Sequence, residues 1–74
     1  MPEKSLRDYT VVVRRDGGTF VAYVPAIPGC HAVAPTPEEA RAELDNVFAM
    51  IAEEYREARQ ALPDDVRDLA ARAG

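Results

Sequence analysis

The sequence predicts a single α+β domain in which a three-stranded antiparallel β-sheet packs against one long helix, with a short C-terminal helix after it. Two observations support this prediction. Extended, β-branched segments bounded by glycine and proline turns fill residues 9–34, and a capped apolar stripe at helical spacing fills residues 37–62. A chain of 74 residues is one domain. We expect its core at about residues 8–62 and a tail at 63–74.

The first predicted elements are the two strands of a β-hairpin. Tyr9–Arg15 contains three consecutive valines and favours extended backbone. Asp16-Gly17-Gly18 can adopt the positive φ of a tight turn, and Thr19–Val24 is the return strand. The prolines of Pro25–Gly29 remove backbone donors, so the chain leaves the hairpin there. Cys30–Ala34 is then a short third strand.

The long helix has a marked start and a marked end. Thr36–Glu39 combines a capping threonine, a proline at the first helical position and the glutamate of a capping box. Pro63 predicts an end near residues 59–61. Residues 64–72 carry acidic capping residues and a thin apolar face, which predicts the short C-terminal helix. The apolar stripe of the long helix consists of Ala40, Leu44, Val47, Ile51, Tyr55, Ala58 and Leu62.

Charge and size both indicate a protein that binds other proteins. The net charge is −4, and residues 35–62 carry seven acidic groups against three basic ones. Such a chain is a poor candidate for autonomous nucleic-acid binding and a reasonable ligand for a basic protein. A domain this small has a marginal core, and its one cysteine, Cys30, allows no internal disulfide. We therefore expect association with a partner or with itself, as a homodimer or tetramer.

The residues that catalysis and metal binding require are sparse. Cys30 and His31 are adjacent, so in a strand they point to opposite faces and cannot form a nucleophile–base pair. Cys30 is interpreted as a small buried hydrophobe. His31 is the only histidine, and phosphate-loop and dinucleotide motifs are absent. We expect no enzymatic activity, no cofactor, no metal and no small-molecule substrate.

No segment of the sequence is a candidate membrane anchor. The longest apolar stretch lies within Val21–Pro28, far short of the roughly 20 residues that span a bilayer. The charged start of the chain does not have the pattern of a signal peptide. A lone cysteine fits a reducing compartment. The expected location is the cytoplasm.

Four residues are candidates for a partner interface. Phe48 and Met50 lie off the apolar stripe, on opposite flanks of the helix, which suggests contact with another chain; the alternative is a core wider than the stripe. Arg14 projects from the first strand, and His31 lies where an exposed strand edge could pair with another chain. The glutamates on the solvent side of the helix form either a solvated face or a docking surface for a basic partner.

The order of these segments resembles the HicB-type antitoxin family. The resemblance covers about two-thirds of the chain and is carried by Asp16-Gly17-Gly18, by the strand leading into Pro25-Ala26-Ile27-Pro28-Gly29-Cys30, and by Thr36-x-Glu38-Glu39-Ala40 at the helix start. It implies a β-β-β-α core of the kind described as a partial RNase H fold. It also implies a type II toxin–antitoxin pair, in which the antitoxin binds HicA, a small basic mRNA-cleaving toxin.

The sequence departs from this family before the helix, at Pro37, which replaces what is often an apolar residue, and after the helix. Ala34 and Pro35 stand where the family usually has a glycine and an acidic residue. Only residues 63–74 follow the helix, too few for the DNA-binding domain of many members, so we do not expect DNA binding. Val11-Val12-Val13 leaves no aspartate for the metal site of true RNase H enzymes. The alternative function is a solitary HicB-like homo-oligomeric interaction module without a cognate toxin.

Overall fold

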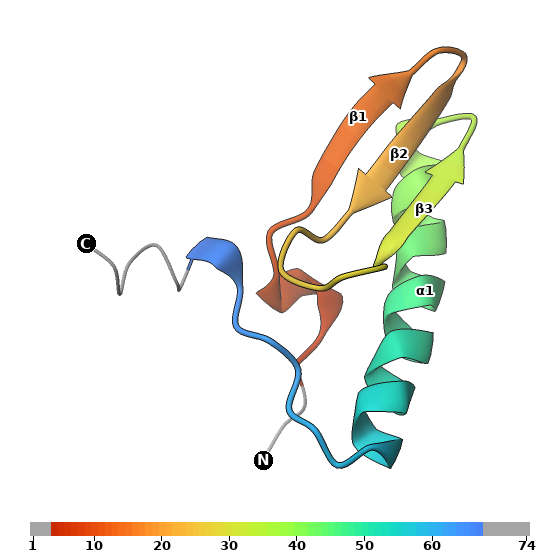
Figure 1. Cartoon of the computed structure of the whole chain (residues 1–74). Coiled ribbons are helices and arrows are strands. Elements are labelled where there is room, and N and C mark those ends of the chain that lie inside the picture. The colour runs from red at the N-terminus through yellow and green to blue at the C-terminus, as the bar shows by residue number, and fades with distance from the viewer. Residues whose placement is uncertain (1–3, 68–74) are drawn as a thin grey trace.

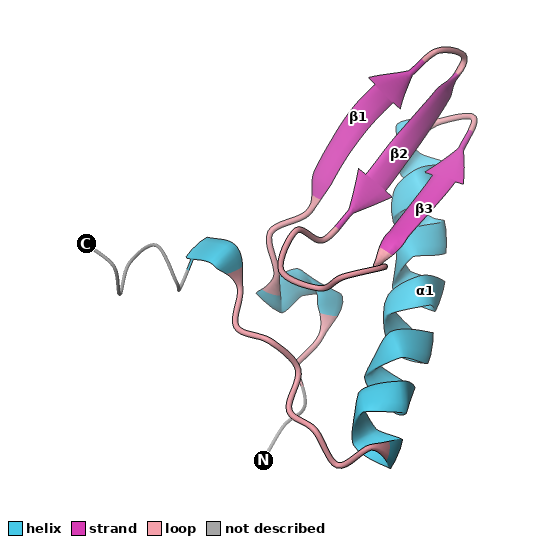
Figure 2. Ribbon diagram, in the orientation of Figure 1, coloured by secondary structure: helices cyan, strands magenta, loops and turns pink. Residues whose placement is uncertain are grey.

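The computed structural model describes residues 4–67 and contains two layers, a β-sheet and a helix that covers one of its faces (Figure 1). The strand order in the sheet is β1-β2-β3, and both pairings are antiparallel. The predicted three-stranded antiparallel sheet packed against one long helix is confirmed. In chain order the elements, which Figure 2 colours by type, are the 3-10 helix η1 (Leu6–Asp8), β1 (Val12–Asp16), β2 (Thr19–Tyr23), β3 (His31–Ala34) and α1 (Pro37–Glu57).

The hairpin forms around the predicted glycine turn, where Gly17 has a φ of 63°. The hydroxyl of Thr19 donates a hydrogen bond of 2.9 Å to the carbonyl of Asp16 and closes the turn. The first strand begins at Val12 rather than at Tyr9 as predicted. The reason is that the backbone N–H of Tyr9 donates to the Leu6 carbonyl and closes η1, and the N–H of Thr10 donates to the carboxylate of Asp65 instead of to the sheet.

The segment between β2 and β3 turns apolar side chains into the core. The Ile27 N–H donates to the Val24 carbonyl at 3.1 Å, and the Cys30 N–H donates to the Ile27 carbonyl at 3.2 Å. Gly29 lies between them with a φ of 78°, a conformation that favours glycine. Ile27 and Cys30 are consequently almost fully buried, and the third strand begins one residue after Cys30.

Helix α1 starts at the predicted residue, but only the threonine half of the predicted capping box forms among the described residues. The Thr36 side chain accepts a hydrogen bond of 3.2 Å from the backbone N–H of Glu39, and Pro37 is the first helical residue. The helix ends at Glu57, slightly before the predicted position, because Arg59 adopts a φ of 57° and the Gln60 N–H bonds back to the Tyr55 carbonyl. This closure resembles the left-handed caps that end many helices.

The cap allows a direct test of the helix start. Replacing Thr36 by alanine is expected to lower the free energy of unfolding by about 1 kcal/mol, because one amide of the first turn loses its acceptor. Thr36→Ser keeps the hydroxyl, so its free energy of unfolding should be close to that of the parent. Urea denaturation of the three proteins measures the difference, and equal stability of all three would contradict the capping role.

The core lies between the sheet and α1, which packs mainly against β3 and β2 and less against β1. Small residues at the centre, Ala22 and Ala32 on the sheet and Ala40 on the helix, let the two layers approach closely. Larger apolar side chains fill the ends of the layer. The buried core residues are Tyr9, Ala22, Val24, Ile27, Cys30, Ala32, Ala40, Leu44 and Phe48.

After α1 the chain turns back and runs beside the N-terminal segment (Figure 1). Val66 and Arg67 begin a helical turn, and the remainder of the predicted C-terminal helix lies outside the described residues. Within residues 4–67, no helix has the length and apolar character needed to cross a membrane.

Candidate partner-binding surfaces

The first candidate surface is the face of the sheet that points away from α1, called here the outer face (Figure 1). The strand register places Arg14 opposite Val21, and Val21 opposite Val33. The next row holds His31, so Arg14 and His31, two predicted interface residues, share this face. The outer face consists of Val12, Arg14, Val21, Tyr23, His31 and Val33.

The outer face combines apolar side chains with the charge of Arg14, and two shallow grooves lie on it. One groove, of about 230 Å³, lies between β1 and β2 beside Arg14, and the other, of about 350 Å³, lies beside His31. Val21 and Tyr23 line both. The valine and tyrosine side chains offer contact area, and the arginine supplies charge, which suits a protein partner better than a reaction centre.

The second candidate surface is a groove of about 420 Å³ between the free edge of β3 and α1, called here the edge groove. Its sheet side is apolar and includes Val33, whose exposed fraction of 54% is high for a valine. Its helix side carries carboxylates. The groove is lined by Val33, Ala34, Pro35, Glu39, Ala42, Glu43 and Asn46.

Met50 extends the helix side of this groove. It follows Asn46 by four residues, and residues at that separation are neighbours on a helix surface. Its exposed fraction is 61%, so Met50 is a surface residue as the sequence predicts, and its contact with a partner stays a prediction. We call the row of residues at separations of three and four the acidic stripe; it consists of Glu39, Glu43, Asn46, Met50, Glu54 and Glu57.

Phe48 is not a surface residue, and its interpretation as a partner contact is wrong. Only 6% of the side chain is exposed, and its ring centroid lies 5.8 Å from that of Tyr9. The core is wider than the apolar stripe because Tyr9, just ahead of β1, packs over this flank of α1. The alternative given for Phe48, a wider core, is therefore the correct one.

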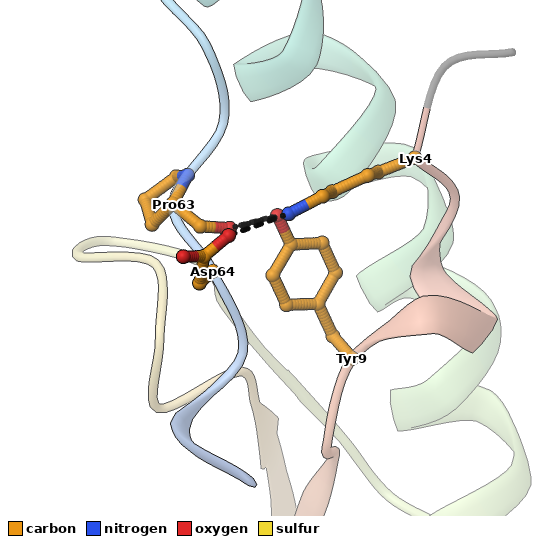
Figure 3. Close-up of polar contacts among 4 residues, drawn as sticks. All are labelled: Lys4, Tyr9, Pro63 and Asp64. Carbon is orange, nitrogen blue, oxygen red and sulfur yellow. Dashed lines mark hydrogen bonds and ion pairs between the residues drawn. The ribbon is translucent and has the colours of Figure 1, made fainter. Parts of the chain in front are cut away.

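The structure also contains a polar cluster that the sequence did not predict, which joins the two ends of the described chain. The Tyr9 hydroxyl donates a hydrogen bond to the Pro63 carbonyl, and Lys4 Nζ lies 3.3 Å from both that carbonyl and Asp64 Oδ1 (Figure 3). We call this cluster the terminal clasp. It consists of Lys4, Tyr9, Thr10, Pro63, Asp64 and Asp65.

Asp65 is the buried centre of the terminal clasp, with 1% of its surface exposed. It accepts hydrogen bonds from the backbone N–H of Thr10 at 2.8 Å and from the Thr10 hydroxyl at 2.7 Å. The backbone bond from Thr10 lowers the pKa of the Asp65 carboxyl, burial opposes this shift, and Arg67 at 3.7 Å adds to it. Asp65 is therefore ionised at neutral pH and holds the tail against the start of β1.

Tyr9 links the terminal clasp to the core. Burial, together with the nearby charges of Asp64 and Asp65, raises the pKa of Tyr9 from 10.0 to about 12. The folded state therefore favours the protonated phenol of Tyr9. The contribution of this phenol to the free energy of unfolding is complete below pH 10.0 and is lost as the pH rises through about 12.

Tyr9→Phe is the corresponding prediction. The ring stays packed on Phe48, but the hydrogen bond to Pro63 is lost, so the free energy of unfolding should fall by about 0.5–1.5 kcal/mol at neutral pH. The variant should also lose less stability than the parent when the pH is raised above the ordinary tyrosine pKa. Denaturation at a series of alkaline pH values checks both effects, and parallel pH profiles would contradict the assignment.

Cys30 and His31 lie on opposite sides of the sheet, as predicted. Cys30 is buried, and burial raises the pKa of its thiol, whereas His31 is exposed on the outer face. Among residues 4–67, no three His, Cys, Asp or Glu side chains are grouped so that they could hold a metal ion.

The outer face and the edge groove thus both have features of a binding site, and a further groove of about 550 Å³ lies between the N-terminal segment and α1. No family model, curated protein or solved structure matches the chain. Functional evidence comes from the sequence motif and from the chemistry of these two surfaces.

Proposed function

We propose that this chain is a HicB-like antitoxin, a non-enzymatic cytoplasmic domain that neutralises a small basic mRNA-cleaving toxin of the HicA type by binding it. The observation that carries the proposal is the ordered motif of glycine turn, Pro-x-Ile-Pro-Gly-Cys segment and threonine-capped helix in residues 16–40. A sheet of three antiparallel strands followed by one helix supports it, because the resemblance implies this order in a partial RNase H fold.

The charge of the domain is the second support. The chain has a net charge of −4, and the exposed glutamates of α1 face solvent on the side away from the core. An acidic surface accelerates the association of a basic partner and disfavours acidic ones. A toxin that binds RNA is basic, so the two proteins would be electrostatically complementary.

Co-expression tests the proposal. The open reading frame next to this gene is expressed from an inducible promoter, alone and together with this chain. A growth arrest by the neighbour that this chain relieves, together with co-purification of the two proteins, is the expected result. A version of this gene with an early stop codon is the control. A neighbour that is not a small basic protein, or an arrest that this chain does not relieve, contradicts the proposal.

The alternative is a solitary homo-oligomeric interaction module. The observation that favours it is the outer face, which no other element of residues 4–67 covers and on which Tyr23, Val21 and the exposed Val33 lie side by side. It predicts a stable dimer or tetramer of the isolated chain. Light scattering after size exclusion that shows a monomer at micromolar concentration contradicts this alternative.

A further inference from the structure

The two edges of the sheet differ in how they are protected. β1 ends in Arg14, Arg15 and Asp16, and charged side chains on an edge strand discourage pairing with another chain. β3, at the other edge, reads His31-Ala32-Val33-Ala34 and has neither a lysine, an arginine nor a carboxylate. Within residues 4–67, no further strand pairs with β3 beyond β2. The β3 edge is therefore the one at which another strand can add.

The edge groove determines which side chains such a strand would carry. An added strand would alternate its side chains between the two faces of the sheet. Those on the inner side would meet the acidic stripe of α1, where Glu39 and Glu43 line the groove. Those on the other side would lie beside Val33 on the outer face. Basic residues suit the inner positions and apolar residues the outer ones.

The carboxylates of the acidic stripe are available for such a partner. Glu39, Glu43, Glu54 and Glu57 are all exposed, and none of them forms an ion pair with another residue in 4–67. Both arginines of α1, Arg41 and Arg56, lie outside this row on the helix. Met50 adds an exposed thioether that can cover the aliphatic stem of a lysine or arginine.

We infer that the edge groove is the docking site for an extended basic segment of a partner protein, which adds to β3 as a fourth strand and places alternate lysine or arginine side chains against the acidic stripe. Backbone hydrogen bonds along β3 would supply affinity, and the alternation of side chains would supply specificity. The inference rests on the proposed function only in naming a basic toxin as the natural source of this segment.

The charge of the acidic stripe favours a basic segment of a partner protein over a second copy of the chain at the β3 edge. If β3 paired antiparallel with β3 of another copy, about a two-fold axis perpendicular to the sheet, both helices would lie on the same side of the joined sheet. The acidic stripes of the two copies would then lie beside each other without a basic residue in either row. Like charges at close range oppose that arrangement, and they favour a basic strand.

A peptide-binding experiment tests the inference. The probe is a short fluorescein-labelled peptide of alternating valine and lysine, and its binding to the full chain is followed by fluorescence anisotropy. The double variant Glu39→Lys/Glu43→Lys is expected to weaken binding by about tenfold or more, because two facing charges are reversed. The matched control, Glu38→Lys/Asp45→Lys, makes the same change of net charge on α1 outside the acidic stripe and should bind within about threefold of the parent.

Backbone pairing needs its own readout. A peptide of the same sequence in which every backbone amide is N-methylated keeps the charges but has no N–H to donate along either edge, and it should bind more weakly by about tenfold or more. Hydrogen exchange measured by NMR should show the amides of β3 protected by the unmodified peptide, while those of β1 are unchanged. Equal binding of both peptides, equal loss in both double variants, or a dimer that protects β3 without peptide would each overturn the inference.

The outcomes separate this inference from the proposed function. Relief of toxicity by Glu39→Lys/Glu43→Lys as strong as that by the parent would overturn the docking site and leave the antitoxin role standing. Peptide binding that follows the predicted pattern, with no effect of the chain on the neighbouring gene product, would support the docking site and remove the antitoxin role.

Discussion

Replacing Phe48 by alanine is expected to destabilise the domain by about 3–5 kcal/mol, enough to unfold a large fraction of a small protein at physiological temperature. The phenyl ring is buried between α1 and the N-terminal segment, where it packs against Tyr9. The surrounding groups can move only partly into the space that the ring leaves. The loss therefore combines apolar transfer with the cost of a cavity.

Met50→Ala is the matched control for Phe48→Ala. Both residues lie in the same two turns of α1, and sequence reasoning assigned both to a partner interface. Met50 is 61% exposed, so its truncation should change the free energy of unfolding by no more than about 0.5 kcal/mol. Urea denaturation followed by circular dichroism measures both variants. Equal stability of the two would mean that Phe48 is not part of the core.

Replacing Asp65 by alanine is expected to lower the melting temperature by roughly 10 °C, the scale set by losing two hydrogen bonds to a charged group in a domain of this size. The variant leaves the N–H and the hydroxyl of Thr10 without their acceptor. Asp65→Asn should lower the melting temperature by less. Its amide oxygen can still accept from the Thr10 N–H, and its amide nitrogen can donate to the Thr10 hydroxyl.

The two Asp65 variants also differ from the parent in acid. Hydrogen bonds from Thr10 hold the pKa of Asp65 below its ordinary 3.8 in the folded state. The stabilisation from this carboxylate is thus fully present above pH 3.8 and is lost as the pH falls through the lower folded-state value. Differential scanning calorimetry at a series of acidic pH values should show a steeper decline for the parent than for Asp65→Asn. An equal decline of the melting temperature with pH in both proteins would show that Asp65 does not cause the loss of stability in acid.

Local signals in the sequence predicted the sheet and the helix well. The glycine turn, the two prolines after β2 and the Thr36 cap each act through neighbours within a few residues, so their effect can be read from the sequence. The end of α1 could not be predicted as closely, because Arg59 adopts a left-handed conformation that is typical of glycine and not of arginine. Pro63 marked the latest possible end and not the actual one.

The terminal clasp and the position of Phe48 could not be predicted in the same way. Both depend on contacts between residues far apart in the chain: Tyr9 contacts Pro63 and Phe48, and Thr10 binds Asp65. Helical periodicity describes one element and does not tell how wide a neighbouring element makes the core. Arg14 and His31 were predicted separately as surface residues, and only the strand register shows that they share the outer face.

The terminal clasp has a consequence for the order in which the chain folds. The bond from Thr10 to Asp65 joins residues 55 positions apart, whereas the hairpin and α1 form from short-range contacts. Closing so long a loop costs more conformational entropy than closing a turn, so we expect the clasp to form after the rate-limiting step. Substitutions at Asp65 or Tyr9 that break clasp bonds should then accelerate unfolding while leaving the refolding rate nearly unchanged. The clasp would set the lifetime of the native state rather than the speed at which it is reached.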